Sequence, residues 1–252
     1  MSGAKHLTLE NVTVSFNGFL AVDNLSLTVG EGELRCLIGP NGAGKTTTLD
    51  LICGKTKPRS GEIKLGPVTL NDLEEHQIAR KGIGRKFQVP SVFRQLTVRE
   101  NLSVAHSRRP GVLRNALQLR RGEASEGLDK LAELVGLENQ LETLAGHLSH
   151  GHTQWLEIAL LLAQDPKLIL MDEPTAGMTA QETHKTAQLF NRLKGNRTLI
   201  VVEHDMGFVK EIAEMISVMH QGKLLAEGTV EEIERHPAVR EAYLGSGGIS
   251  HA

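Results

Sequence analysis

The N-terminal part of the chain alternates between apolar and polar positions. The alternation runs through LTLENVTVSF at 7–16, returns in LSLTV at 25–29, and gives way to ELRCLI at 33–38. A period of two residues is typical of a strand with one buried face, because successive side chains point to opposite sides. The pattern therefore predicts three strands before residue 39, with the turn-rich segment FNGF between the first two.

The period becomes helical in the middle of the chain. Apolar residues recur three and four apart in LTVRENLSVA at 96–105 and in LDKLAELVGL at 128–137. Residues 107–127, between these segments, are rich in Arg and Gly and show no clear pattern. A proline that closely follows Gln88 disfavours helix at the residue before it and marks a break. We therefore predict an inserted helical lobe at about 89–165.

Strand–helix alternation returns after residue 165. PKLILMDEP at 166–174 and TLIVVEHD at 198–205 contain continuous apolar runs, which are typical of parallel strands covered on both faces. MISVMHQGKLLAEG at 215–228 has the pattern of strand, turn and strand, and one or two helices are expected at 231–245.

Together these segments predict a single α/β domain spanning residues 1–252. Its core, at about 1–88 and 166–252, should contain a mixed sheet and an N-terminal antiparallel β-subdomain. The helical lobe is inserted into this core.

The segment GPNGAGKT, Gly39–Thr46, fits the phosphate-binding pattern G-x-x-x-x-G-K-[ST] in full, so the core is predicted to be a P-loop NTPase. A chain of this length matches the pattern by chance roughly one or two times in a hundred, which leaves a Gly-rich turn as the alternative. A strand before the loop and a helix after it favour the functional interpretation. The residues expected to contact ATP here are Gly39, Pro40, Asn41, Gly42, Ala43, Gly44, Lys45, Thr46 and Thr47.

Two acids end the apolar strand LILMDE. A carboxylate in this position beside a P-loop positions Mg²⁺, a role we assign to Asp172 together with the Thr46 hydroxyl. Glu173 would orient the attacking water. His204, at the end of the next apolar strand, could hydrogen-bond the γ-phosphate, although alone it would be an ordinary surface histidine. Gln88 could touch Mg²⁺ or the water.

The composition excludes several other classes of protein. The chain has 28 Lys and Arg against 30 Asp and Glu, a net charge of −2, so it lacks the basic footprint of a nucleic-acid-binding protein. It has no apolar run of the length that spans a membrane and no N-terminal apolar segment of a secretory signal. Cys36 and Cys53 sit in apolar segments and are expected to be buried free thiols in a reducing compartment.

The segment LSHGH at 148–152 predicts a second anion site. Ser149 can cap the following helix, whose free N–H groups then point outward. One complete P-loop needs no second phosphate site, so this helix end makes sense if two copies meet face to face. The neighbouring histidines could instead bind a metal, but no Cys or carboxylate lies beside them at ligand spacing.

The order of these segments resembles the ATP-binding subunit of ABC transporters over nearly the whole chain. The resemblance implies that Phe16 stacks on adenine, although an edge-packing role fits the sequence equally well. It places Gln88 in the Q-loop, Thr175 to Thr179 in the D-loop, and His204 at the switch position. The signature residues implied to reach the partner's ATP are Ser149, His150, Gly151 and His152.

The resemblance also implies cofactors and partners. ATP and Mg²⁺ would bind in a head-to-tail dimer with a second ATP-binding subunit, identical or different. Two transmembrane permease subunits would anchor the dimer peripherally at the cytoplasmic face of the inner membrane, and a periplasmic binding protein would act indirectly. No nucleic acid partner is implied. We expect Val89–Phe93 to receive the permease, with packing inside the lobe as the alternative.

A finer resemblance is to the branched-chain amino acid and amide subgroup, through GIGRKFQ, VVEHDM, LAEGT and AYLG. Within it, FNGFLAVDNLSL, ICGKTKPRSG, LSHG with QWLEIA, and VMHQGKLLAEG are similar to urea-type subunits. The resemblance therefore implies import of urea or short amides, with branched-chain amino acids, a soluble ABC ATPase and a P-loop kinase as alternatives. The chain departs from the usual LSGGQ at His150 and His152, and from the usual D-loop Asp at Thr179.

Overall fold

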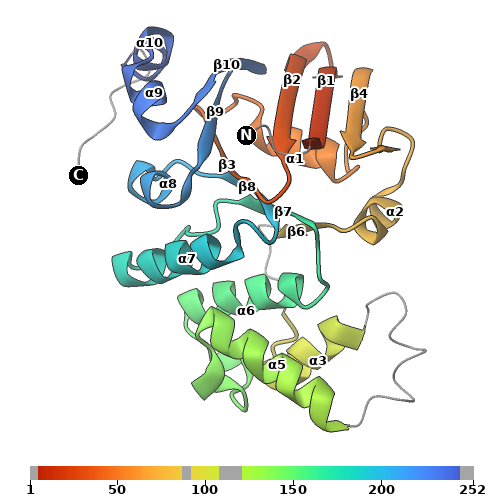
Figure 1. Cartoon of the computed structure of the whole chain (residues 1–252), viewed down its shortest axis with the longest axis vertical. Helices are drawn as coiled ribbons and strands as arrows, with labels where there is room; N and C mark the ends of the chain where they lie inside the picture. The colour runs from red at the N-terminus through yellow and green to blue at the C-terminus, as the bar shows by residue number, and fades with distance from the viewer. Residues whose placement is uncertain (1–4, 87–91, 108–120, 245–252) are drawn as a thin grey trace.

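A computed structural model describes residues 5–86, 92–107 and 121–244. Within these residues, two sheets and a set of helices stack into a core with a helical lobe at one end (Figure 1). None of the described helices is long and apolar enough to cross a membrane.

The N-terminal sheet is antiparallel, as the alternating pattern predicts. Its strands follow the order β2-β1-β4-β5. A tight turn with positive φ at Asn17 (50°) and Gly18 (86°) joins the first two strands, a geometry that matches the twist of a hairpin. The strands are β1 (Lys5–Phe16), β2 (Phe19–Gly30), β4 (Ser60–Leu65) and β5 (Val68–Thr69).

The second sheet is mixed, as predicted. Among the described residues its order is β10-β9-β3-β8-β7-β6, with β9 and β10 antiparallel and the other neighbouring pairs parallel. The strands are β3 (Leu34–Ile38), β6 (Ile83–Lys86), β7 (Leu168–Asp172), β8 (Thr198–Val202), β9 (Met215–His220) and β10 (Lys223–Gly228).

Strand β6 was not predicted from the sequence. It has the residues IGRK, which show neither an apolar run nor a clear alternation. Pairing with β7 makes it a strand, and Gly84 lets helix α6 approach closely. A Cβ at Gly84 would lie 2.5 Å from the Leu161 side chain, so the missing side chain is what admits the helix.

The predicted helices are present in both parts of the chain. Helix α5 begins at Arg121, inside the segment that shows no clear pattern. Its start was not predicted, because its first turns are polar and show no apolar face. The helices are α1 (Lys45–Ile52), α2 (Glu75–Arg80), α3 (Val98–Ser107), α5 (Arg121–Val135), α6 (His150–Leu162), α7 (Ala180–Leu193), α8 (Met206–Ile212), α9 (Val230–Arg235) and α10 (Pro237–Leu244). Short 3₁₀ turns occupy Glu138–Gln140 and Ala145–His147.

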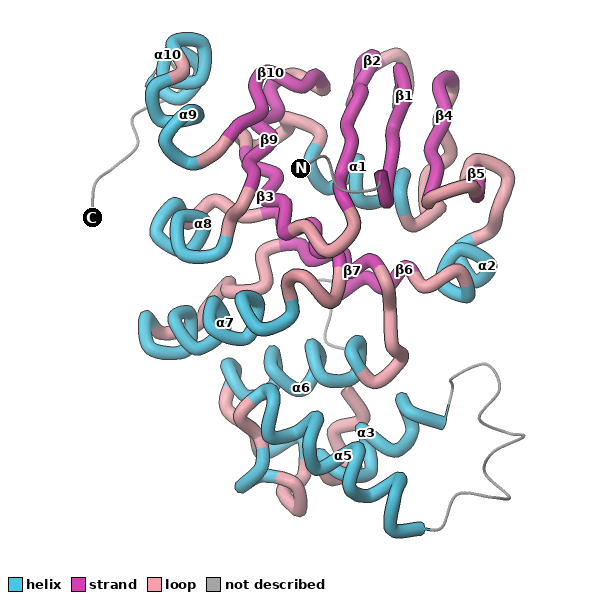
Figure 2. The backbone as a smooth tube through the Cα atoms, in the orientation of Figure 1, coloured by secondary structure: helices cyan, strands magenta, loops and turns pink. Residues whose placement is uncertain are grey.

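Neighbouring side chains of the central strands alternate between two apolar cores. Leu170 and Ile200 pack in the core that also contains α1 and the antiparallel sheet. Met171 and Val201 belong to the other core, which continues through α6 into the lobe. Figure 2 shows that α1 lies on the side of the mixed sheet that faces the antiparallel sheet, and that α6, α7 and α8 lie on the other side of the mixed sheet. Helix α1, and the P-loop that precedes it, are therefore held between two sheets.

Candidate functional site

The P-loop has the backbone geometry that phosphate binding requires. Its glycines have positive φ, at 152° for Gly39, 77° for Gly42 and 99° for Gly44. A Cβ on Gly39 would lie 2.2 Å from the Met219 carbonyl oxygen, and one on Gly44 would lie 2.5 Å from the Ala21 oxygen. Among the described residues no side chain caps α1, so its first N–H groups are free for an anion in the loop. The loop fits the phosphates of a nucleotide.

The Lys45 amine lies within this loop. Its Nζ donates hydrogen bonds to the carbonyl oxygens of Gly39 (2.7 Å) and Pro40 (3.0 Å). Burial lowers the pKa of Lys45, and the negative charges of Glu173 and Asp172 oppose that shift. The sequence therefore folds the P-loop lysine and the two acids of the β7 end into one electrostatic group.

Asp172, at the end of β7, is 4% exposed and hydrogen-bonded to the Thr46 side chain. Its Oδ2 is buried and has no hydrogen-bond partner among the residues that the structure describes, and Arg85 Nη2 lies 3.9 Å away. Burial raises the pKa of Asp172, against the hydrogen bond from Thr46 and the charge of Arg85. A hydroxyl beside an unsatisfied carboxylate oxygen is a donor set that suits Mg²⁺. Thr46 and Asp172, two of the three residues predicted to bind the metal, therefore fit it.

The backbone of Glu173 is left-handed, with φ of 47°. A non-glycine residue in this region is uncommon and is retained where the surroundings fix it. Here the Glu173 N–H donates to the Val202 carbonyl (2.9 Å), which anchors the residue to β8. Its Oε1 lies 3.4 Å from His204 Nδ1, so the structure brings the two predicted catalytic residues together.

Glu203 is a site residue that the sequence analysis did not single out. It is 1% exposed and accepts hydrogen bonds from the Thr175 hydroxyl (2.7 Å) and the His204 N–H (3.1 Å). It therefore holds the loop after Glu173 against the end of β8. Glu203 could have been found from the sequence by the pattern used for Asp172, which is an acid at the end of an apolar strand.

The predicted signature residues form the start of α6. Ser149 caps the helix and accepts a hydrogen bond from the His152 N–H (3.2 Å). Gly151 is buried against Glu182, whose Oε1 would lie 2.0 Å from a Cβ at that position. The His152 ring packs near Trp155, with centroids 5.4 Å apart. These residues are not among those that line the cleft at their own P-loop.

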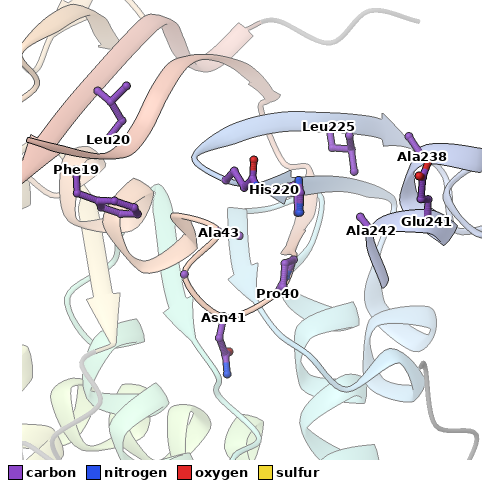
Figure 3. A pocket seen from close by; sticks show the side chains of 12 residues that line it. Phe19, Leu20, Pro40, Asn41, Ala43, His220, Leu225, Ala238, Glu241 and Ala242 are labelled. Carbon is purple, nitrogen blue, oxygen red and sulfur yellow. The ribbon is translucent and has the colours of Figure 1, made fainter. Parts of the chain in front are cut away.

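That cleft, of about 350 Å³, is lined by predicted ATP-contacting residues of the P-loop together with Glu173. Phe16 lines this cleft and is 48% exposed. Phe19, an aromatic residue that was not predicted from the sequence, also lines it. A larger hollow of about 870 Å³ lies beside it, between the P-loop and α10 (Figure 3). Lys45, Thr46 and Glu173 line the smaller cleft and not the larger hollow, so the smaller cleft is the candidate ATP site. Its lining residues are Phe16, Phe19, Ala21, Asn41, Gly42, Ala43, Gly44, Lys45, Thr46, Thr47, Glu173 and Val202.

Some predicted residues lie outside the described part of the chain. Gln88 is one of them, as is the 89–91 segment of the predicted permease contact. Phe93, at the end of that segment, is 49% exposed. The histidines near the start of α6 form no metal cluster within residues 5–86, 92–107 and 121–244.

Comparisons with known proteins agree with this geometry. The ABC transporter family model matches residues 22–176, and the model for the branched-chain amino acid ATP-binding cassette transporter matches residues 223–249. The chain is 41% identical over 249 residues to the high-affinity branched-chain amino acid transport ATP-binding protein LivG of Salmonella typhimurium, covering 95% of this chain and 97% of that protein.

Solved structures have the same fold. An ATP-binding cassette of an ABC transporter in its ADP conformation matches with a TM-score of 0.83 and 29% identity, over 96% of this chain and 99% of that chain. A dimeric cassette bound to ADP and phosphate matches with a TM-score of 0.76 and 27% identity, over 89% of this chain and 98% of that chain.

Proposed function

This chain belongs to the ABC transporter family of ATPases, in its branched-chain amino acid transport type, and we propose that it powers the import of urea or a short amide. The observation that carries the ATPase part of the proposal is that Lys45 and Glu173 line one cleft, while the charges of Glu173 and Asp172 both act on the Lys45 amine. ATP is the substrate, and a bound Mg²⁺ would neutralise charge that develops on its phosphates.

Each residue has a separate task in this proposal. Lys45 exchanges its hydrogen bonds to the loop carbonyls for the β- and γ-phosphates. Thr46 and Asp172 hold the metal, and Glu173 orients the attacking water. His204, 3.4 Å from Glu173, keeps that carboxylate in line with the γ-phosphate. Phosphoryl transfer needs little covalent help from the protein, so positioning and charge supply most of the catalysis.

The site is one half of a larger site in this proposal. The start of α6 presents Ser149 and Gly151 away from the chain's own P-loop cleft. A second ATP-binding subunit, arranged head to tail, would close each P-loop with the partner's α6. The match to a cassette whose solved structure is a dimer supports this arrangement.

Partners and location follow from the transport proposal. Two membrane permeases would hold the dimer at the cytoplasmic face of the inner membrane, and a periplasmic binding protein would deliver the solute. The exposed Phe93 supports a permease contact on the lobe near residues 92–94.

The solute is proposed from family patterns, because an ATPase of this kind does not contact it. FNGFLAVDNLSL, LSHG and VMHQGKLLAEG support urea or a short amide. The 41% identity to a branched-chain amino acid transport protein supports branched-chain amino acids as the second candidate.

Isotopic uptake in a strain that lacks this gene separates the two candidates. Loss of urea uptake at normal leucine uptake would support the first, and the reverse would support the second. If the mutant imports both at the wild-type rate, the proposed substrates are wrong. Complementation with the wild-type gene and with a Lys45→Ala variant shows whether uptake depends on this ATPase.

A further inference from the structure

His150, which stands where the usual signature has a glycine, is bonded to the loop that follows Glu173. Its Nε2 lies 3.0 Å from the carbonyl oxygen of Ala176. A carbonyl oxygen can only accept, so Nε2 carries the proton in this contact. The neighbouring Gly177 has φ of +76°, and a Cβ there would lie 2.9 Å from Nε2. The ring therefore approaches the loop at a place that only glycine leaves open.

Ala176 also bonds to Glu173. The Ala176 N–H donates to the Glu173 carbonyl at 3.2 Å and closes a turn whose first residue is the strained, left-handed glutamate. The other side of this turn is fixed by Glu203, which accepts from the Thr175 hydroxyl. His150 and Glu203 thus hold the same short loop from opposite elements, the start of α6 and the end of β8.

A second contact joins the start of α6 to the start of α7. The Glu182 carboxylate caps α7 by accepting from the N–H and hydroxyl of Thr179, each at 2.9 Å. It also covers Gly151 at the start of α6. Those Thr179 hydrogen bonds, together with the nearby His152 and His150, lower the pKa of Glu182. The carboxylate therefore stays charged, and the D-loop end and the signature start remain in contact.

We propose that His150 is a positioning residue that transmits the state of the signature loop to Glu173. The proposal rests on the head-to-tail dimer, in which the start of α6 contacts the partner's γ-phosphate while Glu173 serves the chain's own ATP. Engagement of the partner's phosphate fixes His150, His150 fixes the Ala176 carbonyl, and the turn presents Glu173 to its water. In this proposal His150, which departs from the usual LSGGQ, couples the chain's own ATP site to the partner's ATP site. It does so in a chain whose D-loop has Thr179 in place of the usual Asp.

The test compares His150→Ala with His150→Gln in the full-length chain with MgATP. The amide of Gln can still donate to the Ala176 carbonyl, whereas Ala cannot. We expect His150→Ala to lower kcat about fivefold, the effect of one lost hydrogen bond, at unchanged KM and with a Hill coefficient near 1. His150→Gln should recover at least half of kcat and the cooperativity.

His184→Ala is the matched control, since His184 is also an exposed helical histidine, ion-paired to Glu211 away from this loop. Its kcat and Hill coefficient should equal those of the wild type. An unchanged kcat in His150→Ala, or a Gln variant as impaired as Ala, would overturn the proposal. If the melting temperature of His150→Ala fell so far that unfolding explained the loss of kcat, the proposal would also be overturned, because His150 would then be merely structural.

The dimer is tested separately with Glu173→Gln. If that variant dimerises with ATP while His150→Ala keeps the wild-type kcat, only the role of His150 fails. If Glu173→Gln remains monomeric with ATP, the head-to-tail arrangement fails, and the His150 proposal falls with it.

Discussion

The amine of Lys86 lies 3.1 Å from the carboxylate of Glu157, and the side chains are 5% and 4% exposed. Lys86 ends β6 and Glu157 lies in the middle of α6, so this buried ion pair ties the edge of the sheet to the signature helix. Within the described part of the chain the Glu157 Oε1 has no hydrogen-bond partner, so the pair is only partly compensated there. A buried ion in such a pair costs several kcal/mol when its partner is removed.

Removal of one member should therefore destabilise the chain more than removal of both. We expect Lys86→Met or Glu157→Leu alone to lower the free energy of unfolding by about 3–5 kcal/mol, and the double variant to recover most of that loss. Urea denaturation measures all three. Lys130→Met is the control, because the Lys130–Glu126 pair is exposed and should contribute little to stability. A double variant no more stable than the singles would contradict this account.

Asp172 should lower the stability of the ligand-free chain at neutral pH. Burial raises its pKa, so the folded state favours the protonated acid, and the contribution to stability is present at low pH and lost as pH rises through the raised pKa. Asp172→Asn has no charge to bury and should equal or exceed the wild type in melting temperature at pH 7 without ligand. The variant should gain no stability from MgATP, whereas the wild type gains it.

The same pKa predicts how magnesium binding depends on pH. Protons compete with the metal for the Asp172 carboxylate, so Mg²⁺ affinity should fall as pH drops through the raised pKa. Titration of MgATP stabilisation between pH 5 and 8 measures this.

For the stability prediction, an Asp172→Asn variant that is markedly less stable than the wild type without ligand would show that Asp172 is primarily structural.

Glu173→Gln should trap an ATP-bound dimer. The amide keeps the shape of the side chain but cannot accept a proton from water, so hydrolysis should fall by about 10²-fold or more while ATP still binds. Size-exclusion chromatography should show a monomer without nucleotide and a dimer with ATP. Lys45→Ala in the same background is the control and should remain monomeric. A monomer in both runs of Glu173→Gln would refute the sandwich.

Much of the fold was predictable because each element carries its own local pattern. Strands β7 and β8 are continuous apolar runs, and the P-loop requires its glycines. Strand β6 was not predictable, since IGRK becomes a strand only through pairing with β7.

The candidate site was predicted less evenly than the fold. Asp172 and Glu173 follow from their place after a strand, whereas the His150–Ala176 contact joins residues 26 apart in sequence. No local pattern encodes such a contact, because it depends on how α6 packs beside the loop. Glu203 could have been found, since it ends an apolar strand as Asp172 does.

Two aromatic residues can stack on the adenine. They differ in that Phe19 also lines the larger hollow beside the cleft, which Phe16 does not. Phe16 and Phe19 both line the cleft, at 48% and 66% exposure. Stacking on a base contributes about 1–3 kcal/mol, so removal of the stacking ring should raise the KM for ATP about tenfold or more. We expect this for Phe16→Ala and a change of less than threefold for Phe19→Ala. The reverse result would assign the stacking to Phe19, and no change in either would exclude stacking on this wall.

Phe93 should form part of the permease contact. Its backbone is fixed to α3, because its N–H donates to Asn101 Oδ1 (2.8 Å) and its carbonyl accepts from Asn101 Nδ2 (3.0 Å). The side chain is 49% exposed, so Phe93→Asp should leave the fold and basal ATPase intact while it places a charge in an apolar contact.

Co-purification with the tagged permease measures this effect directly. We expect Phe93→Asp to abolish recovery of the complex at normal melting temperature. Leu20→Asp is the control, because Leu20 is exposed to a similar extent (43%) but lies on β2, far along the chain from the lobe. Since a charge on either residue costs the isolated chain little, a selective loss with Phe93→Asp can only reflect the contact. Equal recovery of the permease with both variants would place the docking surface elsewhere.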